Sequence, residues 1–320
     1  MTTTTALGSA QAEVATSSPP LRPPSGRALP GDHQRAGWMF ATPFLVCYVL
    51  FLIGPLVIGL VVSFFNTATV SQGLGDWVGI ANYSEVLTSS AFWASMWHST
   101  LFTLLTTPIL VLLPLVFAML VARIRRNQWF FRLAFFAPFV VPSSIVCLIF
   151  AFMYTPETGL ITRAFEVVGL QSPNFLGSES GAWFAVVLLT VWWTFGFSFI
   201  LYLAAIQDIP EELYEAASID GASPLQQIKS ITVPLLGPTI SLVLILQVLA
   251  SLKVFDQIFL LLQGGPDKAT RPAIQYIYDT GFTSYRGGYG AAATMVYFVT
   301  LVVVSATWAL LRRRRQQVAA

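Results

Sequence analysis

Long apolar runs alternate with short polar segments along most of the chain. Each run reaches the roughly 20 residues that an α-helix needs to cross the hydrocarbon core of a bilayer. A single soluble domain of 320 residues could not bury all of these runs in its core. The pattern therefore predicts an all-α polytopic membrane protein with six transmembrane helices, at about 38–65, 99–122, 133–154, 183–206, 236–262 and 290–311.

Composition supports this class and divides the chain into three parts. Apolar residues make up 55% of the sequence and charged residues only 10%, which a soluble domain rarely shows. Residues 1–37 are rich in Thr, Ser, Ala and Pro and lack an apolar period, so we expect a disordered cytoplasmic tail there. Residues 38–311 form the predicted membrane domain, and 312–320 a basic cytoplasmic tail.

Basic residues predict the orientation of the chain, because Lys and Arg are enriched in cytoplasmic loops. An inside N-terminus places twelve basic residues in cytoplasmic segments and only four outside. Both termini are therefore expected in the cytoplasm. The inner set is Arg22, Arg27, Arg35, Arg123, Arg125, Arg126, Arg132, Lys229 and Arg312 to Arg315, and the outer set is Arg163, Lys268, Arg271 and Arg286. Since the arginines lie beside apolar runs, membrane lipid is an expected partner and nucleic acid is not.

The longest polar interlude in the C-terminal half predicts two short helices separated by a turn. Asp208 suits a cap and Pro210 a first helical position. Glu211 and Glu212 follow, where the helix dipole favours negative charge. The stop, the second start and the entry to the next apolar run fall at Gly221, Ser223, Pro224 and Pro234.

This interlude resembles the EAA loop of binding-protein-dependent ABC importer permeases. The matching residues are Glu215, Ala216, Ala217, Gly221, Ile231 and Pro234. In that family the loop, here 207–233, is a coupling helix that docks into a cleft on a cytoplasmic ATPase subunit. The resemblance implies a docking set of Glu215, Ala216, Ala217, Asp220, Gly221, Glu211, Glu212, Ile231 and Pro234, with Glu215 as the leading contact. The alternative is an ordinary solvated amphipathic loop helix.

A second resemblance covers Lys253–Ala293, which is similar to the last two spans of sugar-importing permeases of the maltose and glycerol-phosphate type. The shared features are an FDQI sequence from Phe255, a GGP sequence from Gly264, a YIY sequence from Tyr276 and a GYGAA sequence from Gly288. The resemblance implies a type I ABC importer permease fold, in a bacterial cytoplasmic membrane. The partners implied are a second permease subunit, two ATPase subunits and an extracytoplasmic solute-binding protein.

The chain contains no Gly-x-x-x-x-Gly-Lys phosphate loop. It is therefore expected to be a transport subunit and not an enzyme, with ATP and Mg bound by the partner ATPase subunits. Neither His33 nor His98 has companions at ligand spacing, so no metal site is expected.

Lys253 and Asp256 are charged residues inside a predicted span. A charge at a helix centre costs roughly 2.5 to 3.5 kcal/mol on the insertion scale. Three residues apart on one helix, the two side chains would share a face and could neutralise each other. Two interpretations stay open: the residues line a polar cavity, or they form a structural ion pair at a helix interface.

Aromatic and hydroxyl side chains in the fourth predicted span suit a sugar, whose C–H face stacks on rings while its hydroxyls form hydrogen bonds. Trp193, Ser198 and Tyr202, together with Gln257 of the fifth span, are the candidates for a solute path. The alternative is that they only pack against lipid or other helices.

Two further functional alternatives are an ion-coupled secondary transporter and an ABC importer permease for a solute other than a sugar. The first would need embedded ionisable groups and usually an internal repeat. The sequence shows one charged pair within its spans and no convincing repeat.

Overall fold

The computed structural model describes residues 32–70, 73–124 and 126–318 and separates the chain into two units, Met1–Pro55 and Leu56–Ala320. The predicted tail 1–37 lies outside the described residues except for its end, which from Asp32 belongs to helix α1 (Asp32–Tyr48). A π-helical turn, η1 (Val49–Ile53), follows α1. Helix α2 (Gly54–Val62) continues the same apolar stretch.

Four stretches of the described chain are helical, long and apolar enough to cross a membrane. The first of them runs from the first unit into the second. The last belongs to α15 (Gly287–Val318), which continues as helix through most of the predicted basic tail. The four stretches are Gly37–Val62, Ser90–Ala122, Glu179–Gln207 and Gly287–Leu310.

Two further spans are present only if bent pairs of helices are each counted as one. Helix α5 (Gln128–Val140) and helix α6 (Ser143–Met153) meet at 95°. Here the sequence predicted one run from 133 to 154. Val141 is extended because a residue before proline avoids the helical region, and Pro142 follows it.

The second bent pair leads into the fifth predicted span. Residues Pro224–Leu235 join α12 (Gly237–Leu252) at 63°. The continuous run expected at 236–262 is wrong, because α12 ends at Leu252 and a separate helix, α13 (Asp256–Leu262), begins after three residues. No proline or glycine marks that interruption in the sequence.

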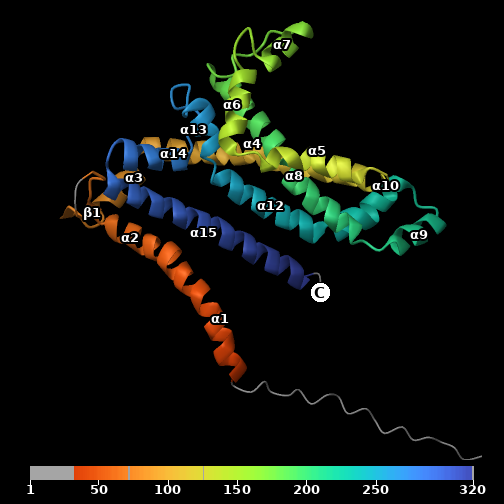
Figure 1. Cartoon of the computed structure of the whole chain (residues 1–320), viewed down its shortest axis with the longest axis horizontal. Helices are drawn as coiled ribbons and strands as arrows, with labels where there is room; N and C mark the ends of the chain where they lie inside the picture. The colour runs from red at the N-terminus through yellow and green to blue at the C-terminus, as the bar shows by residue number, and fades with distance from the viewer. Residues whose placement is uncertain (1–31, 71–72, 125, 319–320) are drawn as a thin grey trace, which may run out of the picture. The chain divides into compact units, whose positions relative to one another are not determined.

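The core of the second unit is a layer of long helices that lie side by side (Figure 1). Helix α8 (Glu179–Gln207) packs against both α4 (Ser90–Ala122) and α5, and α12 packs against α4. Gly196 of α8 allows a close approach, since a Cβ there would lie 2.1 Å from the carbonyl oxygen of Phe135. Buried apolar side chains from α4, α8 and α12 fill the space between them.

Short segments connect the spans at the end of the bundle away from the 207–233 loop. They include β1 (Phe65–Asn66), β2 (Asp76–Trp77), α3 (Ala81–Thr88), α14 (Ala273–Tyr278) and the π-helical turn η3 (Asp279–Thr283). Both Nη atoms of Arg286 donate to the Glu85 carboxylate at 2.8 and 2.7 Å, which ties α3 to the start of α15. These hydrogen bonds lower the pKa of Glu85 below its ordinary value.

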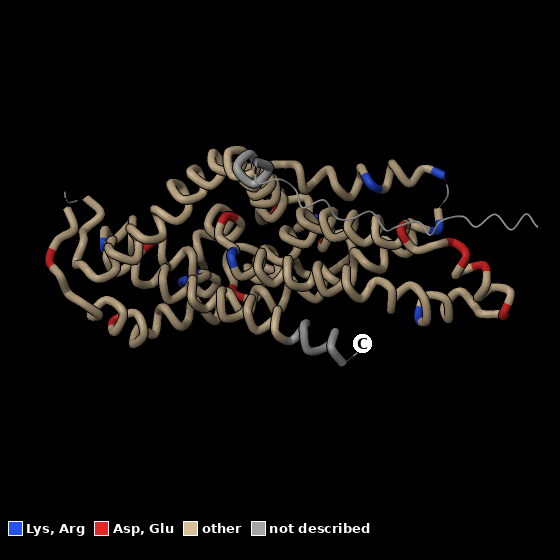
Figure 2. The backbone as a smooth tube through the Cα atoms, turned by 90° about the horizontal axis from the view of Figure 1, so that it is seen from below, with Lys and Arg blue, Asp and Glu red and all other residues tan. Residues whose placement is uncertain are grey.

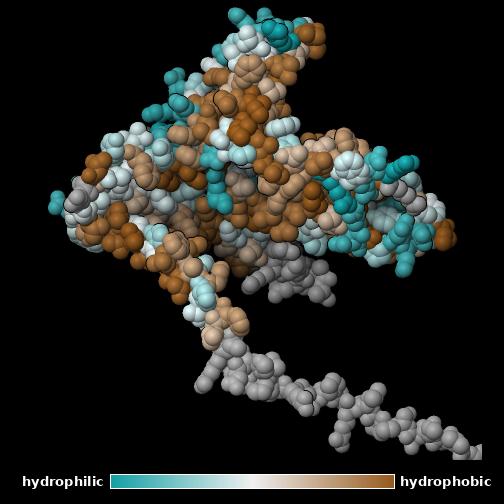
Figure 3. Space-filling model, in the orientation of Figure 1, coloured by the Kyte–Doolittle hydropathy of each residue, from teal (hydrophilic) through white to brown (hydrophobic). Residues whose placement is uncertain are grey.

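Helix α7 (Leu160–Val167) belongs to the remaining connection, between α6 and α8. Figure 2 shows most charged positions toward the two ends of the long helices. In Figure 3, hydrophobic side chains cover much of the region of these helices, whereas hydrophilic ones gather near α7 and at the end with α9 and α10. This distribution is typical of a protein with an apolar membrane belt.

Candidate coupling loop and solute path

The first helix of the 207–233 loop is α9 (Glu211–Ile219). Its N-cap is Pro210, with no side-chain hydrogen bond, and Asp208 instead ends α8. The expected Asp208 cap is therefore wrong. The predicted stop is confirmed: Gly221 has a φ of +78°, and the amide of Ala222 donates to the carbonyl oxygen of Ala217 at 2.9 Å.

The second helix begins as the sequence predicted, with Ser223 as N-cap of α10 (Pro224–Gln227). The amide of Ser223 donates to Gln226 Oε1 at 2.7 Å, and the Ser223 hydroxyl accepts from the Gln226 amide, which completes a capping box. The helix continues through a π-helical turn, η2 (Ile228–Thr232), and α11 (Val233–Leu235).

Side-chain hydrogen bonds hold the two helices of the loop together. Gln227 Nε2 donates to Ser218 Oγ at 2.9 Å, and the hydroxyls of Tyr214 and Thr232 lie 2.9 Å apart. The turn, the capping box and these two contacts make the loop a compact elbow, although no residue of α9 is buried.

Most of the predicted docking residues are exposed. Ala217 and Ile231 are partly buried, whereas Glu211, Glu212, Glu215, Ala216, Asp220, Gly221 and Pro234 are exposed. Three apolar side chains that the sequence did not single out are exposed among them: Leu213 at 43%, Leu225 at 74% and Ile219 at 87%. Exposed apolar side chains beside acidic ones form a surface suited to a protein partner.

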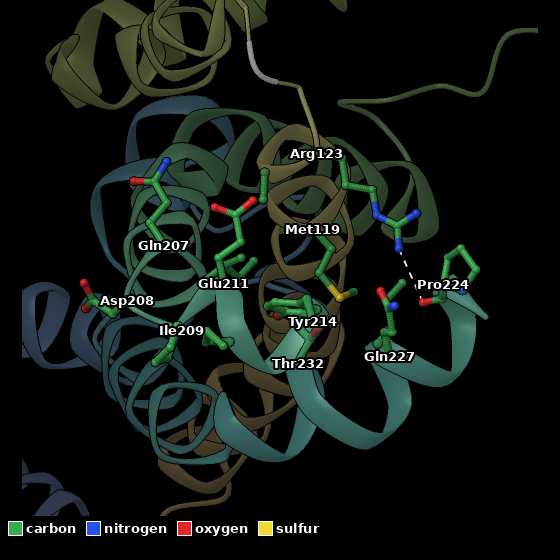
Figure 4. A pocket seen from close by; sticks show the side chains of 14 residues that line it. Met119, Arg123, Gln207, Asp208, Ile209, Glu211, Tyr214, Pro224, Gln227 and Thr232 are labelled. Atoms are coloured by element: carbon green, nitrogen blue, oxygen red, sulfur yellow. Dashed lines mark hydrogen bonds between the residues drawn. The ribbon is translucent and has the colours of Figure 1, made fainter. Parts of the chain in front are cut away.

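A cavity of about 720 Å³ lies on the inner side of the elbow (Figure 4). Its walls come from the last turn of α4, the end of α8 and both loop helices. Arg123 of α4 reaches across it, with Nη2 3.5 Å from the carbonyl oxygen of Pro224. Beside this cavity the elbow therefore stands away from the end of α4.

The interruptions of the third and fifth spans meet each other. Ser143 Oγ, at the start of α6, donates to Asp256 Oδ2 at 3.1 Å, and α6 packs against α13. Trp193 Nε1 of α8 donates to the carbonyl oxygen of Val141 at 3.0 Å, just before the bend. The structure thus brings the predicted residues Trp193 and Asp256 to one place.

Lys253 and Asp256 do not share a helix face, because Lys253 caps the end of α12 and Asp256 begins α13. No ion pair joins them in the described part of the chain, and both side chains are exposed. The structure therefore does not support the interpretation of Lys253 and Asp256 as a structural ion pair.

Ser198 and Tyr202 lie inside the helix layer. The Ser198 hydroxyl accepts from Gln247 Nε2 of α12 at 2.9 Å, and the Tyr202 side chain is fully buried in the apolar core. Gln257 is partly buried on α13. Sequence reasoning overlooked Ser143 and Gln247, although a serine after Pro142 and a lone amide in an apolar run were both visible.

Comparisons with known proteins agree with these features. The family model described as "binding-protein-dependent transport system inner membrane component" matches residues 78–317. The trehalose/maltose permease MalF of Thermococcus litoralis is 33% identical over 85% of this chain and 91% of its own. The sulfoquinovosyl glycerol permease SmoG of Agrobacterium fabrum is 31% identical over 87% of this chain and 90% of its own.

A solved structure is similar over most of the chain. It is a bacterial ABC transporter involved in the import of the acidic polysaccharide alginate, and the match covers 88% of this chain and 97% of that one. The sequences are 25% identical and the TM-score is 0.79. The chain belongs to the family of inner-membrane permease components of binding-protein-dependent ABC importers.

Proposed function

We propose that this chain is the membrane-spanning permease subunit of an ATP-driven importer for a sugar, an oligosaccharide or a glycerol-phosphate-like solute. One observation supports the proposal most directly: a compact, exposed elbow with the EAA pattern lies at the end of a helix bundle, and the sequence has no phosphate loop of its own. The relatives named for maltose and sulfoquinovosyl glycerol support the carbohydrate class.

The energy for transport comes from two partner ATPase subunits, which bind ATP and Mg. One of them receives the exposed face of the elbow. Glu215 provides a charged contact there, and the small side chains of Ala216 and Ala217 allow close approach. Ile219 and Leu225, which are largely exposed, supply apolar area that docking would bury at about 25 cal/mol per Å².

The solute passes between this chain and a second permease subunit. The exposure of Lys253 and Asp256 supports this path, since each charge would cost roughly 2.5 to 3.5 kcal/mol in the centre of a bilayer. Such residues are expected to face a water-filled cavity or a partner and not lipid tails. Asp256 and the indole ring of Trp193 together offer an acceptor for sugar hydroxyls and a flat apolar face.

The bends next to this path supply the moving parts. Helices α6 and α13 are short, are joined to each other, and each follows a break in its span. ATP-driven closure of the ATPase subunits displaces the elbow, and the displacement changes the angles at these breaks. An extracytoplasmic binding protein then delivers solute to the outward-open path.

Reconstitution tests this function. The chain is assembled with its ATPase subunits, second permease and binding protein in liposomes, and uptake of radiolabelled sugars is measured with and without internal ATP. We expect uptake only with ATP. Uptake driven by an ion gradient without ATP would instead support a secondary transporter, and a binding protein that holds only non-sugar solutes would contradict the carbohydrate class.

A pair of charge reversals tests the docking face. Glu215→Lys should abolish copurification of the ATPase while leaving membrane insertion intact. Glu166→Lys makes the same change of charge on α7, away from the elbow, and should have no effect. Retained ATPase binding and uptake in the Glu215→Lys protein would contradict the docking assignment.

A further inference from the structure

Three polar side chains join the inner ends of α5 and α8, at the point where the chain enters the elbow. Gln207, the last residue of α8, donates from Nε2 to Gln128 Oε1 at 3.0 Å. Its Oε1 accepts from Arg132 Nη2 at 2.9 Å. The nitrogen and the oxygen of the Gln207 side-chain amide thus both form hydrogen bonds. We name Gln128, Arg132 and Gln207 the inner clasp.

The inner clasp also reaches α4. Gln128 Nε2 lies 3.4 Å from the carbonyl oxygen of Val121 and 3.3 Å from that of Ala122, in the last turn of α4. The Val121 carbonyl also accepts from the amide of Ile124 at 3.0 Å, and carbonyls in a last helical turn are the ones that need partners from outside the helix. The side-chain amide of Gln128 therefore joins the end of α4 to the start of α5. Its oxygen also accepts a hydrogen bond from Gln207 of α8.

The elbow follows α8 in the chain directly after the inner clasp. Only Asp208, Ile209 and Pro210 separate Gln207 from α9. On the other side, the cavity keeps the elbow away from α4, where the contact is the 3.5 Å hydrogen bond from Arg123 to Pro224. A displacement of the elbow at this end is therefore applied first to the last turn of α8.

Further along, α5 meets α8 at a second place. Gly196 lies directly against the backbone of Phe135, and the Phe135 ring lies 4.9 Å from the Phe199 ring. Contacts between the two helices continue from there toward the bend, where Trp193 Nε1 donates to the carbonyl oxygen of Val141 at 3.0 Å. The clasp lies about three turns of α8 from Gly196 and is the contact of this helix pair next to the elbow. Together, these contacts make α5 and α8 a single lever.

We propose that the inner clasp is a positioning device that passes the displacement of the elbow from α8 to α5, and so to the bend at Pro142. The proposal rests on the transport function above. Without the clasp, the last turns of α8 would move without the start of α5, and less of the displacement would reach the bend. ATP hydrolysis would then continue with less solute imported.

The test measures solute imported per ATP hydrolysed in the reconstituted complex, with the thermal midpoint of the complex as a second readout. Gln207→Ala and Arg132→Ala are each expected to lower the ratio by about fivefold, the lower end of the range for loss of coupling between two sites. ATPase activity and thermal midpoint should stay near wild-type values. Arg126→Ala is the control, because Arg126 is an exposed arginine at the same boundary outside the clasp.

The double variant gives a sharper criterion. If Arg132 and Gln207 act through one contact, the combined variant should be no worse than either single one. Gln207→Glu, which keeps the acceptor for Arg132, should restore part of the ratio. An unchanged ratio, additive losses, or a parallel fall of uptake, ATPase activity and thermal midpoint would each overturn the proposal. Absence of ATP-driven uptake in the wild type would instead refute the proposed function itself.

Discussion

Replacing Gly196 by alanine tests the close packing of α5 on α8. A Cβ at this position would lie 2.1 Å from the carbonyl oxygen of Phe135 and 2.7 Å from Cα of Phe136, and ordinary contacts begin at 3.4 Å. Both neighbours are backbone atoms, so no side chain can turn aside. Helix α5 would have to move away from α8 by about 1 Å, and overpacking of this kind costs about 1 to 3 kcal/mol.

The same movement would loosen the aromatic cluster of this interface. The rings of Phe135 and Phe195 lie 5.1 Å apart, and edge-to-face pairs of this type contribute about 0.5 to 1.5 kcal/mol beyond their area. We therefore expect Gly196→Ala to lower the thermal midpoint of the purified chain in detergent, and to reduce uptake because the angle of α5 changes.

The chain offers a matched control for this substitution. Gly237 begins α12, and a Cβ there would meet nothing within 4 Å, so Gly237→Ala should leave the thermal midpoint unchanged. Equal melting of the Gly196→Ala and wild-type proteins would refute the packing argument. Equal losses in both variants would show that the loss does not come from the close approach, because alanine has a higher helix propensity than glycine at either position.

Three other perturbations address the elbow, the proposed solute path and the Glu85–Arg286 pair. Ser223→Ala removes the cap of α10 and should destabilise the elbow by about 1 kcal/mol, seen as faster proteolysis within the loop in membranes where insertion is unchanged. Asp256→Asn should change the apparent affinity or selectivity for solute with little change of thermal midpoint, and the reverse pattern would favour a structural role. The pKa of Glu85 in the folded chain lies below its ordinary value. The contribution of the Glu85–Arg286 pair to folding stability is therefore complete above the ordinary pKa and is lost as the pH falls through the lowered pKa. The melting curves of wild type and Glu85→Gln should thus differ slightly at neutral pH, because the pair is half exposed, and should converge in acid.

Local rules predicted the elbow well, because its helices begin and end at residues with strong intrinsic preferences. Ser223 and Gly221 act through their own backbone and immediate neighbours, and the structure confirms both. Asp208 was misassigned because an aspartate can lie at the end of one helix or cap the start of the next. Helix α8 extends one residue beyond the predicted span, so Asp208 lies at its end.

The bends of the third and fifth spans could not be read from periodicity. Pro142 marks one of them, but the angle of 95° depends on how α6 packs against α13. The break after Leu252 has no proline or glycine to mark it, and the charged residues on either side, Lys253 and Asp256, were interpreted as parts of one continuous helix. The positions of Ser198 and Tyr202 depended likewise on which face of α8 meets α12 and the other long helices.

The paired hydrogen bonds between Glu85 and Arg286 have a mechanical consequence for transport. They fasten α3 to the root of α15, and stacking of Arg286 at 4.4 Å over the Tyr289 ring reinforces the joint. A rearrangement of the bundle at this end would therefore move α3 and the start of α15 together. Any change of angle would have to come from other joints, such as the breaks that precede α6 and α13.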